Sequence, residues 1–106
     1  MPDRPTREYA RLTAIVIGGV PLEITSAELC WIQHWDGETP AQREWEVAGR
    51  TKQREVRDGR REVVLHFPDH RLKGTGAVIS SPGPGLTVFE VIGLGGLVRL
   101  RDETQI

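Results

Sequence analysis

Short runs rich in Val, Ile, Thr and Leu recur along this chain, and they constrain its fold more than any other feature. They include "LTAIVI", "REVVLHF" and "LTVFEVI", and each run ends at a Gly or Pro turn signal. Such runs follow one another at intervals of about ten residues, which is typical of β-sandwiches and β-barrels. We therefore expect an all-β fold, a small sandwich or barrel of about seven antiparallel strands.

Length and composition indicate one folded domain. The chain has 106 residues, of which 38% are hydrophobic, and its net charge of −1 argues against polyanion binding through bulk charge. We assign residues 9–106 to the domain and the polar, proline-containing residues 1–8, "MPDRPTRE", to a flexible arm. One cysteine, Cys30, excludes an internal disulfide and fits synthesis in the reducing cytoplasm. No run approaches the roughly 18 apolar residues of a membrane span, so we expect no membrane partner.

One short helix is expected near residues 26–35. Thr25 and Glu28 have the spacing of a capping box, and Asp36-Gly37 would end the helix. The next segment is ambiguous, because Thr39-Pro40 resembles a helix start. Residues 43–50, "REWEVAGR", instead alternate polar and apolar side chains, and this pattern favours a strand.

The dipeptide Asp58-Gly59 predicts a β-hairpin over residues 50–67, because it separates two extended runs. Its first strand is too charged to be buried along its length, so we expect the hairpin to project from the body. From Arg50 to Lys73 there are eight basic and four acidic residues. The predicted partner-binding residues of the hairpin are Arg50, Lys52, Arg54, Arg57, Asp58, Gly59, Arg60 and Arg61. Three interpretations stay open: charges that guard an exposed edge, an acidic protein partner, or nucleic-acid phosphates.

Groups that could carry chemistry are sparse. Cys30 with His34, and His66 with His70, would be the residues of a zinc site, but the paired CxxC spacing of such sites is absent. No nucleophile motif such as GxSxG is present, and the glycines of "GTG" and "GLGG" do not spell a phosphate-binding loop. We therefore expect no enzyme activity, no metal, no cofactor and no small-molecule substrate.

A resemblance to a known family involves the C-terminal half and one earlier segment. "LKGTGAVISS", a Pro-Gly turn and "LTVFEVIGLGGLVRL" are similar to the C-terminal part of tail-tube proteins of tailed phages. "GGVPLEITSAELCW" also resembles an early strand of that family. The resemblance implies a subunit of stacked six-fold β-rings, in which projecting hairpins or loops bridge successive rings.

The leading hypothesis is thus a non-enzymatic structural subunit of a phage or phage-like particle that acts by homo-oligomeric assembly. Its partners would be copies of itself and other particle proteins, with possible contact with DNA, and its location would be the virion. The predicted assembly strands contain Val88, Phe89, Val91, Ile92, Leu94 and Leu97, with one face in the core and the other in the assembly. The alternative is a monomeric β-barrel module that binds an anionic partner through the basic hairpin.

Overall fold

The computed structural model describes residues 4–101, and these form nine β-strands and no helix. The strands are β1 (Thr6–Arg11), β2 (Ala14–Ile17), β3 (Val20–Leu22), β4 (Ile24–Asp36), β5 (Thr39–Thr51), β6 (Gly59–His66), β7 (Arg71–Pro82), β8 (Thr87–Gly93) and β9 (Val98–Leu100). The expectation of an all-β fold is confirmed, with more strands than expected. None of the described residues belongs to a helix that could cross a membrane.

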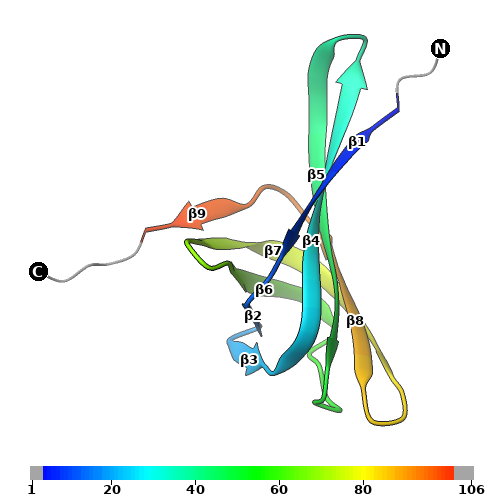
Figure 1. Cartoon of the computed structure of the whole chain (residues 1–106), viewed down its shortest axis with the longest axis vertical. Helices are drawn as coiled ribbons and strands as arrows, with labels where there is room; N and C mark the ends of the chain where they lie inside the picture. Colours follow the sequence, from blue (N-terminus) through cyan, green and yellow to red (C-terminus); the bar gives the residue numbers. More distant parts are fainter. Residues whose placement is uncertain (1–3, 102–106) are drawn as a thin grey trace, which may run out of the picture.

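All nine strands belong to one antiparallel sheet. Its order is β1-β4-β5-β8-β7-β6-β2-β3, and β9 pairs with β7. The sheet curls into a half-barrel, from which the β4–β5 hairpin extends well beyond the other strands (Figure 1). The core fills the concave face and includes Ile15, Leu29, Val47, Leu65 and Phe89, each fully buried.

The expected helix at 26–35 is wrong, because this segment lies in strand β4. β4 pairs with β1 on one side and with β5 on the other, so its backbone is committed to the sheet. Ala27 and Leu29 point into the core, and the Thr25 hydroxyl donates to the Arg50 carbonyl at 3.2 Å instead of capping a helix. Pairing along both edges outweighs the local capping pattern. The strand interpretation of residues 43–50 is confirmed, since they lie in β5.

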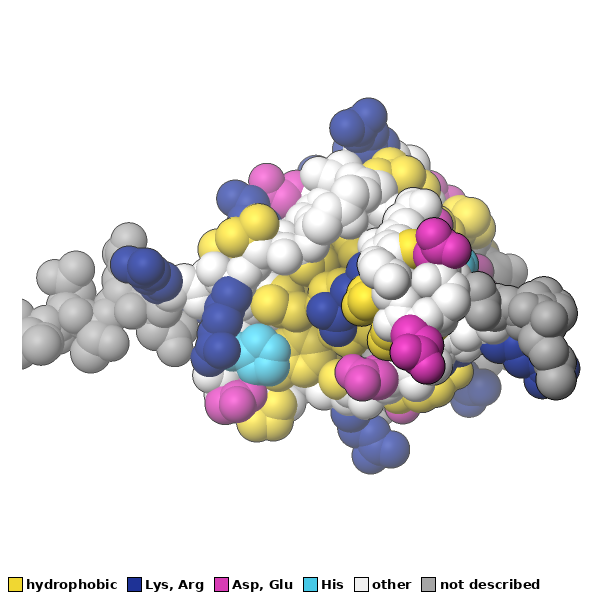
Figure 2. Space-filling model, turned by 90° about the horizontal axis from the view of Figure 1, so that it is seen from above, with side chains coloured by type: hydrophobic (Ala, Val, Ile, Leu, Met, Phe, Trp, Pro, Cys, Tyr) yellow, Lys and Arg dark blue, Asp and Glu magenta, His cyan; other side chains and the backbone are white. Residues whose placement is uncertain are grey.

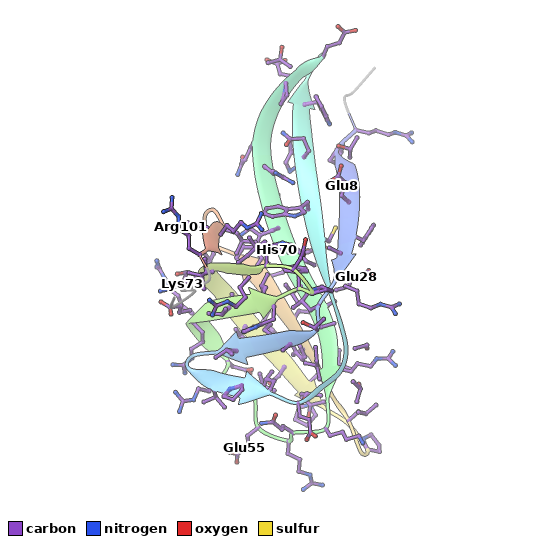
Figure 3. All side chains as sticks on the ribbon, turned by 60° about the vertical axis from the view of Figure 1, so that its left-hand side comes forward. Glu8, Glu28, Glu55, His70, Lys73 and Arg101 are labelled. Atoms are coloured by element: carbon purple, nitrogen blue, oxygen red, sulfur yellow. The ribbon has the colours of Figure 1, made fainter. Side chains whose placement is uncertain are left out.

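The expected hairpin over residues 50–67 is also wrong. β5 ends at Thr51 and pairs with β4 and β8, whereas β6 begins at Gly59 and pairs with β2 and β7. Residues 52–58 form a loop between these two parts of the sheet, at the end of the molecule opposite the β4–β5 hairpin (Figures 1 and 3). The hairpin at an Asp-Gly turn is instead the one between β4 and β5, at Asp36-Gly37.

The residues expected to form a flexible arm, 1–8, include three that lie in a strand. Thr6, Arg7 and Glu8 belong to β1, where they pair with Gln33, Ile32 and Trp31 of β4. Residues 1–3 lie outside the described residues. The pairing arises because β1 supplies backbone groups to an edge of β4 that would otherwise be open.

Trp45 packs beside some of the glycines of "KGTG" and "GLGG". Its side chain is 2% exposed, and its indole N–H donates to the Gly95 carbonyl at 2.8 Å. A Cβ atom added to Gly93 would lie 2.5 Å from this indole. One added to Gly76 would lie 3.3 Å from the ring and 2.3 Å from Val91. The glycines therefore leave room for the large Trp45 ring.

Candidate assembly surface

The convex face of β7 and β8 carries exposed hydrophobic side chains. Ile79 is 57% exposed, Val88 46% and Ile92 40%. The neighbouring strands add two small apolar residues. Ala77 of β7 pairs with Ile92, and Ala48 of β5 pairs with Glu90 of β8. We call these five residues, Ala48, Ala77, Ile79, Val88 and Ile92, the outer patch. The solvent side of an antiparallel sheet is usually polar, so such a patch indicates a surface that becomes covered.

Two carboxylates lie within this surface. Glu46 of β5 pairs with Ile92, and Glu90 of β8 pairs with Ile79 on one side and with Ala48 on the other. Glu46 and Glu90 line a hollow of about 70 Å³ together with Ile92. A basic side chain from another molecule would find both negative charge and apolar contact here.

The predicted assembly residues are divided between the two faces. Val88 and Ile92 lie in the outer patch, and Leu94, just beyond β8, is 44% exposed. Phe89 and Val91 are fully buried in the core, and Leu97 is half-buried against it. The first three are therefore available for contact with another molecule, whereas the others hold the subunit together.

Leu94 belongs to a second partly apolar surface, beside β9. A hollow of about 460 Å³ is lined by Leu94, Val98 and Leu100 together with polar residues of β6 and β7. Val98 is 67% exposed, and the Lys73–Glu62 ion pair, at 3.5 Å, borders the hollow. The ion pair, not a nucleophile, is the main polar feature of this surface.

The basic residues predicted to form one hairpin are divided among three elements. Arg50 lies on β5 and pairs with Val88, residues 52–58 form the loop, and Gly59, Arg60 and Arg61 begin β6. Arg57 donates to the Gly18 carbonyl at 3.2 Å. The loop is thus anchored to the body instead of forming a projecting arm.

Asp58 is the centre of a second anchor of this loop. Its carboxylate accepts a hydrogen bond from the Ser80 hydroxyl at 2.6 Å, and its carbonyl accepts one from Arg61 Nε at 3.1 Å. Arg54 and Arg57 line a hollow of about 600 Å³ beside it. The structure therefore brings part of the basic set together near β7 and leaves Arg50 apart.

The histidines and the cysteine do not converge. Cys30 and His34 both lie on β4, where four residues of extended chain span about 13 Å. His34 contacts Glu44 at 3.0 Å, and His70 contacts Asp69 at 2.6 Å while its ring stacks on Phe67. Within residues 4–101 no three His, Cys, Asp or Glu side chains come close enough together to hold a metal ion.

Sequence reasoning missed the outer part of the β4–β5 hairpin, residues 31–45, which we call the distal hairpin. Its core-side face continues above the half-barrel with Trp31, Trp35 and Arg43. The Arg43 guanidinium lies 4.0 Å above the Trp31 ring, and the Trp35 indole donates to the Thr6 hydroxyl at 3.0 Å. The alternation in "ITSAELCWIQHWD" and the following Asp-Gly dipeptide were the signals for this hairpin.

Seen from above, the molecule has a hollow with hydrophobic side chains at its floor and charged side chains around it (Figure 2). This hollow is the open upper end of the half-barrel, beside the distal hairpin.

Comparison with protein-family models, curated proteins and solved structures finds no match to this chain.

Proposed function

We propose that this protein is a non-enzymatic structural subunit that assembles with copies of itself, as the subunit of a phage or phage-like particle. The outer patch is the observation that carries the proposal. Ile79, Val88 and Ile92 are large, exposed and neighbours on adjacent strands of a rigid sheet. Covering them would remove apolar area from water without any rearrangement of the backbone.

The chemistry of the surface supports assembly over catalysis. The patch is largely apolar, and its neighbouring ionisable groups are the carboxylates of Glu46 and Glu90 and the guanidinium of Arg50, which pairs with Val88. A subunit of this kind needs shape and edge pairing, which the sheet supplies.

Light scattering on a sizing column tests the proposal. We expect the wild-type protein to elute at a multiple of its 11.9 kDa mass and to keep that mass at high salt, because apolar burial is not screened. Replacing Ile79 and Val88 together by Thr should shift the protein to the monomer. The control is Val16→Thr, a half-buried valine on β2, which should leave the mass unchanged. A wild-type monomer at every concentration would contradict the proposal.

A second candidate function rests on the basic loop. Arg54 and Arg57 line a hollow of about 600 Å³ at the end of the molecule opposite the distal hairpin. A monomeric module could bind an anionic partner there. Its affinity for single- or double-stranded DNA would fall steeply between 50 and 200 mM salt, to an extent set by the roughly three to four phosphates contacted. Undetectable binding of either DNA at the lower salt concentration would exclude this candidate for nucleic acids.

A further inference from the structure

The open strand edges include those of β1, β3 and part of β5, and of these three only the edge of β3 is protected by a proline within it. β3, at one end of the sheet, has three residues with Pro21 in the middle, and proline discourages edge pairing. β1, at the other end, has six residues without proline, and among the described strands it pairs only with β4. In β5, residues 39–45 pair with β4 except at Ala41 and Gln42, whereas pairing with β8 begins at Glu46. Residues 41–45 of this β5 edge also contain no proline.

The side chains on these two edges have opposite charges on each face. On the convex side, β1 carries Arg7 and Arg11, and β5 carries Glu44 and Glu46. On the concave side, β1 carries Glu8 and β5 carries Arg43 (Figure 3 labels Glu8 on β1, beside the distal hairpin). The charge pattern of β1 is thus complementary to that of β5 on both faces.

Several of these charges are free for an external partner. Within residues 4–101, the side chains of Glu8, Arg11 and Glu46 form no hydrogen bond or ion pair. Arg43 stacks on Trp31, and a stacked guanidinium keeps the N–H groups in its plane available to a carboxylate.

We propose that β1 of one copy pairs with the free edge of β5 in a second copy, so that the sheet continues from subunit to subunit. In each subunit β1 is antiparallel to β4, and β4 is antiparallel to β5, so the two edges run in the same direction. A neighbour related by rotation about an axis along the strands therefore presents β1 parallel to β5. This contact is head-to-tail, and repetition of it closes a ring or extends a filament.

One parallel register brings opposite charges close together on both faces of the sheet. Glu8 lies beside Arg43, and because parallel strands advance together, Tyr9 then lies beside Glu44. Arg11 comes level with Glu46, whose backbone edge is already paired with Ile92 of β8, so the contact there is between the Arg11 side chain and the Glu46 carboxylate. Pairing stops at Glu46, where β8 takes over the edge of β5. In this register residues 6–10 of β1 lie along residues 41–45, the part of β5 that β8 leaves open.

This inference rests on the proposed self-assembly, and two charge-reversed proteins test it. The first carries Glu8→Arg with Arg11→Glu, and the second carries Arg43→Glu with Glu46→Arg. Each alone should raise the concentration at half-assembly about tenfold or more, because two attractive cross-strand pairs become repulsive. An equimolar mixture should restore assembly, since each reversed β1 can then meet a reversed β5 and each native edge a native one. One chain with all four substitutions should assemble alone.

The results separate this inference from the proposed function. If wild-type protein assembles and the Ile79→Thr, Val88→Thr protein does not, self-assembly through the outer patch stands. If the charge-reversed proteins then assemble as wild type does, or the mixture fails to restore assembly, the β1–β5 pairing is overturned. A wild-type monomer at all concentrations would overturn both.

A cross-link tests the register without depending on the folding of the charge variants. In a Cys30→Ala background, Arg7→Cys with Gln42→Cys should form disulfide-linked multimers upon mild oxidation, because these residues lie side by side in the proposed register. Within one subunit β4 separates the two positions, so an internal disulfide is excluded. Arg7→Cys with Arg43→Cys is the control, since Arg43 faces the other side of the sheet. Equal cross-linking of both proteins, or of neither, would contradict the register.

Discussion

At the scale of single residues, Trp45 determines which glycines the chain needs. Its ring lies where a side chain at position 93 would otherwise be, whereas at position 76 the nearest obstacle to a Cβ atom is Val91, at 2.3 Å. The indole is also held in place, because it donates to the Gly95 carbonyl. A rigid, hydrogen-bonded ring cannot move aside as the end of a flexible side chain could.

Gly93→Ala should therefore destabilise the protein by about 1–3 kcal/mol, the usual cost of overpacking a core. The added methyl would lie 2.5 Å from the Trp45 indole. Chemical denaturation followed by tryptophan fluorescence measures this change. Gly96→Ala is the control, because a Cβ atom at that position would have nothing within 4 Å. Equal stability of the two variants would contradict the role given to Trp45.

A second prediction at this scale concerns Asp69. The hydrogen bond with His70, at 2.6 Å, lowers the pKa of the Asp69 carboxyl below its ordinary value. Since the folded-state pKa is the lower one, the stabilisation is present above the unfolded-state pKa and is lost as pH falls through the folded-state pKa. His70→Asn should raise the pKa of Asp69 toward its ordinary value. Carbon-detected NMR titration of the carboxyl group would show this shift, and an unchanged titration curve would contradict it.

At the scale of elements, the distal hairpin is held by its own side chains instead of by the core. The pairing of β4 with β5 is irregular between Gln33 and Trp35. Gln33 Nε2 lies 3.0 Å from the His34 carbonyl and 3.2 Å from the Ala41 carbonyl, and it donates to both. This side chain therefore supplies hydrogen bonds at the point where the strand ladder is interrupted.

Gln33→Ala should increase amide hydrogen exchange in residues 33–43 by about fivefold, because a lost hydrogen bond costs about 1 kcal/mol of local stability. Global stability should change by less than about 0.5 kcal/mol, since the irregularity lies outside the core. Gln42→Ala is a suitable comparison, because the Gln42 amide reaches only Glu44 among the described residues. Faster exchange in both proteins, or a drop in global stability, would argue against a local role of Gln33.

The two Asp-Gly dipeptides show how far the sequence predicts these elements. A hairpin was expected at Asp58-Gly59 and a helix end at Asp36-Gly37, whereas the hairpin occurs at Asp36-Gly37. What decides between them is whether the flanking runs can pair. The run before Asp58 is strongly charged, and Lys52 to Asp58 stay outside the sheet. The helix expected at 26–35 failed for a related reason, because pairing with β1 and β5 is a long-range interaction that no local pattern contains.

At the scale of the whole molecule, the curl of the sheet decides which predicted residues can meet a partner. Period-2 alternation in β8 correctly indicated two apolar faces. Val88 and Ile92 are exposed, whereas Phe89 and Val91 are buried. The pairing of opposite charges on β1 and β5 could not be predicted, because it depends on strand order and on where β8 begins to cover β5. Self-assembly is therefore a hypothesis in which the residues can be identified from the sequence, whereas their spatial arrangement requires the structure.

The position of β8 in the sheet also has a consequence for biosynthesis. β8, residues 87–93, lies between β5 and β7 and joins the β1-β4-β5 part of the sheet to the β7-β6-β2-β3 part. A chain emerging from the ribosome can form the β4–β5 hairpin early, but it cannot join the two parts until β8 has been translated. Up to that moment the inner edge of β5 stays open. Completion of this fold therefore waits for β8, and nascent chains that still lack β8 would be the species most exposed to mispairing.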